Sequence, residues 1–172
     1  MQGYTVRPIR ADEWERVRDL RVRAVADPVA AMAFVDTVEQ TAAHGDAFWR
    51  GRAAGGAVDS ATARQVVAED ASGTWVGSAT GLREHLGDQD YEGREVPVDG
   101  CAVVGVYVAP EARGSGTLGA LLDALGEWGG PLRLSVHTGN ARAVRAYEKV
   151  GFTPFGEPYA GSLGPTQEMR RP

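Results

Sequence analysis

An almost uninterrupted apolar run, CAVVGVYV at residues 101–108, is the feature that most constrains the fold of this chain. Such a run is typical of a strand that is buried on both faces of a sheet. It leads through the glycine-rich segment at 109–119 into apolar residues at helical spacing, Leu118, Leu121, Leu122, Leu125 and Trp128. A buried strand followed by a turn and an amphipathic helix predicts an α/β or α+β domain.

The remaining segments supply further strands and helices. Apolar and β-branched runs predict strands at residues 4–9, 64–70, 74–82, 132–136 and 164–171. Helical spacing predicts helices at residues 12–25, 30–41, 46–52 and 140–150. Asp12, with Glu15 three residues on, is the expected cap of the first helix, and Asn140 that of the last. Residues 52–61 and the acidic segment 84–100 are expected to be loops, which leaves a sheet with mixed strand directions.

Length, net charge and the lack of long apolar runs limit the classes of protein to which this chain can belong. A chain of 172 residues fits one domain with a sizeable core, so we expect a single domain over residues 1–172. The net charge of −5 argues against broad nucleic-acid binding. No apolar run approaches the roughly 18 residues that span a bilayer, and the first residues lack the apolar block of a signal peptide. We therefore expect a cytoplasmic protein, without membrane or nucleic-acid partners, that is a monomer or a homodimer.

Few side chains suggest a metal site or a nucleophile. Cys101 is the single cysteine and lies in the apolar run, where a small core residue is the expected role. His44, His85 and His137 have no metal-ligand spacing, so no metal is expected. The chain also lacks the G-x-S-x-G turn that would support an acyl-serine intermediate.

The glycine-rich segment contains G-x-G-x-x-G at Gly114, Gly116 and Gly119, which matches a dinucleotide-binding fingerprint. That fingerprint requires its first glycine almost directly after the strand, and here five residues, APEAR, intervene. The next strand ends in His137 and Thr138, where an acid would have to hold a ribose hydroxyl. No Lys-Ser or Lys-Thr pair follows the glycines, so this is not a P-loop. Backbone amides at a helix start still favour an anion, and a simple tight turn is the alternative.

Two motifs resemble those of the GNAT superfamily of N-acetyltransferases. Arg113 and Gly116 match the family's acyl-CoA motif [R/Q]-x-x-G-x-[G/A], in which Leu118 replaces the final small residue. The second motif, N-x-x-A-x-x-x-Y-x-x-x-G-F, is matched in full by Asn140, Ala143, Tyr147, Gly151 and Phe152. The resemblance covers residues 66–152 well and the rest loosely.

This resemblance implies a twisted mixed sheet of six or seven strands, flanked by helices, in which the strands at 101–108 and 132–136 splay apart. The pantetheine arm of acetyl-CoA would bind the backbone of Val106 and Val108 in that gap. The pyrophosphate would rest on the amides from Arg113 to Leu118. In full, the cofactor-binding residues that the resemblance implies are Val106, Tyr107, Val108, Arg113, Gly114, Ser115, Gly116, Thr117, Leu118, Gly119, Asn140 and Ala143.

The resemblance also implies that Tyr147 points its hydroxyl at the thioester sulfur. A phenol there can protonate the departing thiolate as a general acid, whereas Val144 and Val150 on the same helical face favour a packing role. The attacking amine needs a proton acceptor, and the apolar strand carries no carboxylate. Asp99 is the nearest candidate base, Glu84 and His85 are rivals, and a base acting through water is equally open. Gly105 in the strand predicts a bulge or a close backbone approach.

We therefore expect an acetyl-CoA-dependent N-acetyltransferase that transfers the acetyl group directly to a primary amine of a small molecule or peptide. A non-catalytic acyl-CoA-binding or sensing module on the same fold is the alternative. The identity of the acceptor stays open: it could be a small amine, an amino acid, an aminoglycoside-like antibiotic or a protein N-terminus. Four aromatic residues either line its pocket or pack in the core: Trp49, Trp75, Tyr91 and Tyr159. A cluster of acidic residues either attracts a cationic amine to the cleft or simply forms a solvated loop: Asp88, Asp90, Glu92, Glu95 and Asp99.

Overall fold

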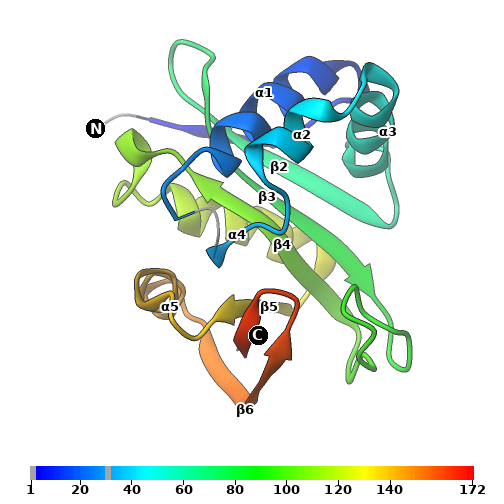
Figure 1. Cartoon of the computed structure of the whole chain (residues 1–172), viewed down its shortest axis with the longest axis vertical. Coiled ribbons are helices and arrows are strands. Elements are labelled where there is room, and N and C mark those ends of the chain that lie inside the picture. Colours follow the sequence, from blue (N-terminus) through cyan, green and yellow to red (C-terminus); the bar gives the residue numbers. More distant parts are fainter. Residues whose placement is uncertain (1–2, 30–31) are drawn as a thin grey trace.

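A mixed seven-stranded sheet organises the chain, which a computed structural model describes over residues 3–29 and 32–172. Its strand order is β1-β2-β3-β4-β5-β7-β6 (Figure 1). The strands are β1 (Thr5–Pro8), β2 (Ala63–Glu69), β3 (Trp75–Glu84), β4 (Gly100–Val108), β5 (Leu132–His137), β6 (Thr153–Gly161) and β7 (Gly164–Arg171). All neighbouring pairs are antiparallel except β4 and β5, so the expected α/β class with mixed strand directions is confirmed.

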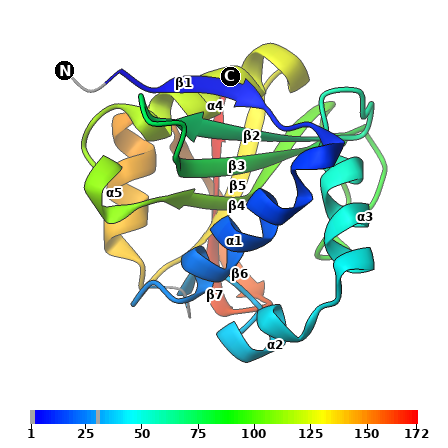
Figure 2. The ribbon, with the colours of Figure 1, turned by 90° about the horizontal axis from the view of Figure 1, so that it is seen from above.

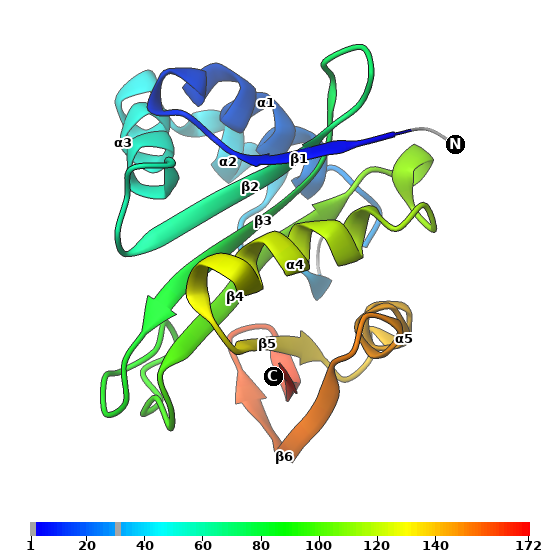
Figure 3. The same ribbon diagram turned by 180° about the vertical axis from the view of Figure 1, so that it is seen from behind.

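Helices cover both faces of the sheet. Figure 3 shows α4 (Thr117–Gly129) across β2–β4, with α1 (Trp14–Val25), α2 (Val38–Ala43) and α3 (Asp46–Gly56) on the other side. Figure 2 shows the same layers from above, with α5 (Ala141–Lys149) beside the β4–β5 boundary. The apolar face of α4 buries Leu121, Leu122 and Leu125 completely, and Cys101 of β4 is also fully buried. None of the helices in the described ranges combines the length and apolarity that crossing a bilayer requires.

The central strands β4 and β5 separate soon after they begin. They pair only through Cys101 with Leu132 and Ala102 with Arg133, although β4 continues to Val108 and β5 to His137. Figure 1 shows the two strands diverging from this short contact. The predicted splay is confirmed, and it leaves the second half of β4 with one free edge.

Gly105 interrupts β4 with a bulge. Its φ of +60° lies in the left-handed region, and the β3–β4 register shifts between Ser78 and Thr80 opposite it. A left-handed residue is favourable for glycine because it has no Cβ to clash with its own backbone. The strand therefore changes direction at the point where it faces the splay.

The N-terminal elements differ from the sequence prediction in their limits. Asp12 is an exposed residue of a 3₁₀ turn, and the capping interaction comes instead from the buried carboxylate of Glu13, which accepts the Arg10 amide at 2.9 Å. The helix predicted at 30–41 is wrong in extent: α2 spans Val38–Ala43, residues 32–37 are not α-helical, and residues 30–31 lie outside the described ranges.

Two further elements were misjudged from composition. The segment 52–56 is not a loop but the end of α3, where Gly56 lets the helix approach β2 closely: a Cβ there would lie 3.3 Å from the Cβ of Gln65. Strand β6 was not predicted because Pro154, Pro158 and its glycines resemble a loop. It is an exposed edge strand, where proline is tolerated since one side needs no ladder hydrogen bonds.

Candidate active site

A large cleft of about 940 Å³ opens where β4 and β5 diverge. One side is lined by β4, the start of α4 and α5, and another by β5 and the β6–β7 turn. The segment after α1 and the β3–β4 connection complete the wall. Of the predicted cofactor-binding residues, the cleft collects Val106, Tyr107, Val108, Arg113, Gly114, Gly116, Leu118, Gly119, Asn140 and Ala143.

The turn before α4 presents a row of free backbone donors. Gly114 and Gly116 have φ values of +77° and +88°, and a Cβ built on either would meet nothing within 4 Å. Within the described chain, the amides from Gly114 to Gly119 have no hydrogen-bond acceptor. These donors stand at the N-terminus of a 13-residue helix, where the helix dipole also favours a negative charge. The turn is therefore built to hold an anion.

Arg113 has a different role from its neighbours. Its amide donates to the carbonyl of Pro110 at 3.3 Å, so it is not part of the free row that was expected to begin there. Its guanidinium donates to the carbonyl of Val108 at 2.9 Å and lies 2.5 Å from a carboxylate oxygen of Asp27. Arg113 thus ties the turn to both β4 and the end of α1.

The remaining side chains of the turn differ in whether they line the cleft. The hydroxyls of Ser115 and Thr117 lie 2.8 Å apart, Ser115 donates to the carbonyl of Ala112, and neither residue lines the cleft. Leu118, which departs from the family motif, is half-buried against the core and also lines the cleft. Its side chain therefore supplies apolar packing at the first turn of α4, while its amide belongs to the free row.

The free edge of β4 offers further backbone groups. The amide of Ala109 donates to Val76 in β3, so alternation along the strand directs the polar groups of Val106 and Val108 toward the open edge. The carbonyl of Val108 is already occupied by Arg113. The expected extra-strand pairing consequently has the amide of Val108 and both backbone groups of Val106 free, whereas Arg113 already uses one of the two acceptor positions of the Val108 carbonyl.

The start of α5 supplies side chains from the second motif. Asn140 is the predicted N-cap: its Oδ1 accepts the Ala143 amide at 3.2 Å, and it is only 8% exposed. Tyr147 lines the cleft, with its ring centroid 5.7 Å from that of Phe152. Burial, together with the neighbouring Tyr91, raises the pKa of the Tyr147 phenol well above its ordinary value. The phenol is therefore protonated at neutral pH and can act as a proton donor.

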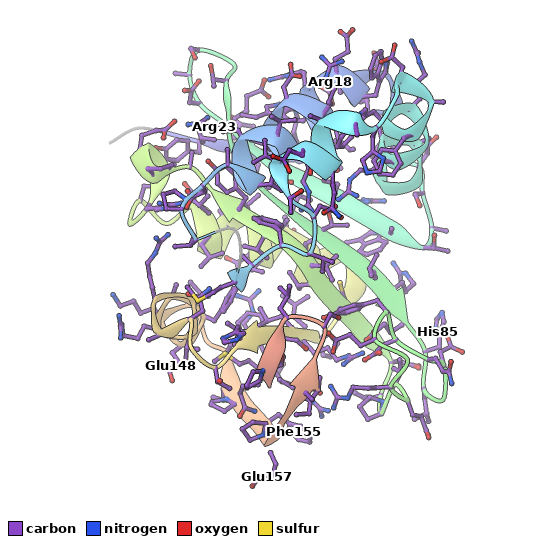
Figure 4. All side chains as sticks on the ribbon, in the orientation of Figure 1. Arg18, Arg23, His85, Glu148, Phe155 and Glu157 are labelled. Carbon is purple, nitrogen blue, oxygen red and sulfur yellow. The ribbon has the colours of Figure 1, made fainter. Side chains whose placement is uncertain are left out.

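The structure does not bring the predicted base candidates into the cleft. Asp99 precedes the first residue of β4, at the opposite end of the strand from Val108, where its 75%-exposed side chain accepts the Leu86 amide. Glu84 is buried in an ion pair with Arg133, and Figure 4 shows His85 on the outside of the β3–β4 connection. Sequence proximity to the apolar strand was misleading because the end of that strand that faces the cleft, at Val108, lies nine residues after Asp99.

A different carboxylate faces the cleft. Glu92, from the β3–β4 connection, lines it, and the Oε1 atom accepts the Ser162 hydroxyl at 3.1 Å. The Oε2 atom is buried and has no hydrogen-bond partner in the described chain. Tyr91 and Ser135 stand in the same wall, and Ser135 bonds the hydroxyl of Tyr159 at 2.7 Å. The sequence showed Glu92 only as one member of an acidic loop.

Two arginines were also missed. Arg21 of α1 and Arg52 of α3 both line the cleft. A signal for Arg21 was present, because it lies four residues from both Val17 and Val25 and so interrupts the apolar face of its helix. Arg52 had no comparable signal, because the composition of its segment, residues 52–61, resembles that of a loop.

Some of the other residues considered from the sequence are core residues. Trp49 and Trp75 are core residues, at 1% and 5% exposure. Burial raises the pKa of the Cys101 thiol to about 12, so it stays a neutral core residue rather than a nucleophile. Across the described ranges, no group of three or more His, Cys, Asp or Glu side chains is arranged to hold a metal ion.

Several solved structures with the same architecture are described as acetyltransferases. A phosphinothricin acetyltransferase from Sinorhizobium meliloti, in complex with AcCoA, matches with a TM-score of 0.65 and 21% identity over 98% of this chain and 88% of that one. A spermidine N-acetyltransferase from Vibrio cholerae, in complex with CoA and spermine, matches with a TM-score of 0.62 and 16% identity over 97% and 94%. A GCN5-related N-acetyltransferase from Kribbella flavida gives 0.64 and 22% over 98% and 97%. At these identities, the likeness shows the fold.

The family follows from the sequence itself. No curated protein matches the chain significantly. The profile of the acetyltransferase (GNAT) family, however, matches residues 32–152, which include the free-amide turn and the Asn140–Phe152 motif. This is well over half of the 172 residues, and the seven-stranded fold agrees with it. The chain therefore belongs to the GNAT family of acetyltransferases.

Proposed function

We propose that this protein is an acetyl-CoA-dependent N-acetyltransferase that transfers the acetyl group directly to a primary amine. One observation carries the proposal: the splay of β4 from β5 brings the free-amide turn and the phenol of Tyr147 into one cleft. The turn suits a pyrophosphate, and the open edge of β4 suits the amide groups of a pantetheine arm. The proposal concerns this cleft and needs no metal.

Binding uses backbone more than side-chain charge. The amides from Gly114 to Gly119 hold the pyrophosphate, and the carbonyl of Val106 and the amide of Val108 pair with the arm. Arg113 acts as a positioning residue, since its guanidinium is engaged by Asp27 and Val108. The side-chain NH₂ of Asn140 makes no hydrogen bond inside the described chain and faces the same cleft, so it is available to the arm.

Acetyl-CoA supplies an activated thioester whose leaving group is a thiolate. Tyr147 donates its phenolic proton to that sulfur, and its raised pKa keeps the proton in place until it is needed. The amide of Val106, next to the Gly105 bulge, donates to the carbonyl oxygen as negative charge develops there. Cys101 takes no part, because it is buried away from the cleft.

We assign to Glu92 the role of general base, for which the sequence suggested Asp99. The Oε2 atom of Glu92 is buried and has no hydrogen-bond partner among the described residues, and the residue lines the cleft, so it can accept the proton of an incoming ammonium through water. Ser162 holds the other carboxylate oxygen and so orients the group. Exposed Asp99 remains a loop residue that caps the turn at Leu86.

The experiment is an amine panel with two readouts. Thiol release from acetyl-CoA is followed with amino acids, polyamines, aminoglycosides and short peptides, and the acetylated product is identified by mass. Binding of acetyl-CoA, coenzyme A and NADH is compared by calorimetry. Turnover with any amine supports the proposal. Binding of acetyl-CoA without turnover on any amine favours a sensing module, and selective binding of NADH contradicts both.

A further inference from the structure

Arg21 projects from the apolar face of α1 into the cleft. Its Nη2 lies 3.3 Å from Asp36, and its guanidinium lies over the ring of Phe34 at 4.4 Å. Its Nε is fully buried and has no partner in the described chain. Its Nη1 lies 3.9 Å from the position that a Cβ would take at Gly105. The guanidinium thus stands beside the β4 bulge with part of its donor capacity unused.

Arg52 reinforces this positive charge. It extends from α3 into the same cleft, and no hydrogen bond or ion pair to it exists within the described residues. Desolvation, and then the proximity of Arg21, lowers its pKa, with only Asp36 opposing. Two guanidinium groups therefore share one carboxylate, and Asp36 is itself 39% exposed. Arg21 is only 15% exposed, and a largely buried cation without full pairing is unfavourable, whereas Arg52 adds an exposed charge beside it. This wall of the cleft therefore favours an incoming anion.

The anion is not the pyrophosphate of the acyl donor. That group belongs at the free amides between Gly114 and Gly119, beyond the end of β4. Arg21 faces Gly105, in the interior of the strand. The cations that flank the donor end of the cleft come instead from α5, namely Arg142, Arg145 and Lys149. The two arginine sites thus belong to different parts of the cleft.

We propose that Arg21 and Arg52 bind an oxyanion of the acceptor, which makes the acceptor a small primary amine that also carries a carboxylate or phosphonate-type group. This inference rests on the proposed N-acetyltransferase activity and names its substrate class. Arginine suits such a group because its planar donors match two oxygens at once. Glu92 lies in the same cleft and suits the amine end of the acceptor. Polyamines, which are cations throughout, are expected to be poor acceptors because the two arginines repel them.

The test compares Arg52→Gln with Arg50→Gln. Arg50 lies on the same helix, stacks over the ring of Trp14 at 4.4 Å and does not line the cleft. Binding of N-acetyl amino acids, their carboxamides and the matching aminophosphonate derivatives is measured by calorimetry, so the readout does not require turnover. Arg52→Gln is expected to weaken binding of the oxyanion forms about 10- to 100-fold, the effect of losing one charge-assisted hydrogen bond. Binding of the carboxamides should not change, and Arg50→Gln should match the wild type.

The outcomes separate the two proposals. Equal wild-type affinity for acids and carboxamides, or an unchanged affinity of Arg52→Gln for the acids, overturns the acceptor assignment. Comparison of carboxylate with phosphonate forms identifies which oxyanion fits better. If Arg52→Gln weakens binding of the acids but the wild type acetylates no amine, the anion site is supported and the enzymatic proposal is contradicted. Arg21→Lys provides a second variant, and retained acetyl-CoA affinity shows that it is folded.

Discussion

The guanidinium of Arg113 lies 2.5 Å from a carboxylate oxygen of Asp27, which joins the free-amide turn to the end of α1. The other oxygen of Asp27 accepts the amide of Val29 at 3.1 Å, and the carboxylate is only 4% exposed. This ion pair therefore joins two segments that are 86 residues apart in sequence. This contact sets where the donor end of the cleft stands relative to the helices of the acceptor end.

Asp27→Asn should loosen this junction. The loss of a charge-assisted bond at a buried group is expected to cost about 1–3 kcal/mol in the free energy of unfolding. Affinity for acetyl-CoA should also fall, because the turn is less firmly held. Chemical denaturation and calorimetry measure the two effects. Arg23→Gln is the matched control: it breaks the exposed pair with Glu111, which should cost no more than about 1 kcal/mol. Equal effects of the two substitutions would contradict the role of the Asp27–Arg113 pair in holding the turn.

Tyr147→Phe should remove the proton donor and preserve the packing against Phe152. Loss of a general acid typically reduces turnover about 10²- to 10⁴-fold, while the affinity for acetyl-CoA should stay within about twofold because the ring remains. Steady-state kinetics with the best acceptor of the panel, together with calorimetry, separate the two parameters. An unchanged kcat would remove Tyr147 from the chemistry, and a large loss of affinity would assign it to binding instead.

Gly116→Ala and Gly119→Ala should act in opposite ways. Gly116 has a φ of +88°, so an added Cβ is strained there by about 1–2 kcal/mol, and it would lie in the turn that we propose to hold the pyrophosphate. Gly119 is helical, and a Cβ would make an ordinary contact with Val150 at 3.6 Å, so its replacement should stabilise α4 by up to about 1 kcal/mol. Denaturation midpoints test both. A Gly116→Ala variant with wild-type stability and affinity for acetyl-CoA would show that the turn is not a cradle.

Arg133 should be essential for the position of the loop that carries Glu92. Its guanidinium bonds Glu84 twice at 2.6 Å and Asp90 at 3.0 Å, all three being nearly fully buried. Arg133→Met leaves two buried carboxylates without a counter-charge, which should cost about 3–5 kcal/mol and reduce kcat further. Urea denaturation of this variant at neutral pH measures the cost. A change below about 1 kcal/mol would contradict the structural role.

Stability should also depend on pH through Asp90. Desolvation acts to raise the pKa of Asp90, but the amides of Arg94 and Glu92 and the guanidinium of Arg133 outweigh it, so the pKa is lowered on folding. A lowered pKa means that the folded state binds the proton less tightly than the unfolded state. The stabilisation is therefore complete above the unfolded pKa of about 3.9 and is lost as the pH falls below it. Unfolding free energies measured between about pH 6 and pH 3 should fall less steeply for Asp90→Asn than for the wild type.

Part of the site could be predicted because its groups are close in sequence. Residues 101–119 run as strand, turn and helix, so their order alone places free amides at a helix start. Asn140 was predicted as a cap for a local reason, since the bond it accepts comes from the amide three residues on. The bulge at Gly105 was likewise indicated by a glycine within an apolar strand. Each of these features depends on interactions over a few residues.

The acceptor side could not be predicted, because it is assembled from distant segments. Arg21, Arg52 and Glu92 come from α1, α3 and the β3–β4 connection, and nothing in their local sequence brings them to one cleft. Asp99 was the nearest acid along the chain, yet the strand carries it to the opposite end from Val108.

The family, the buried central strand and the glycine-rich turn ahead of a helix could be predicted from the sequence alone, because backbone conformation and periodic burial are encoded locally. The tertiary structure decided which charges share the cleft. The crossing of helices and the splay of β4 from β5 depend on packing over the whole sheet, and only that packing places two arginines beside the Gly105 bulge.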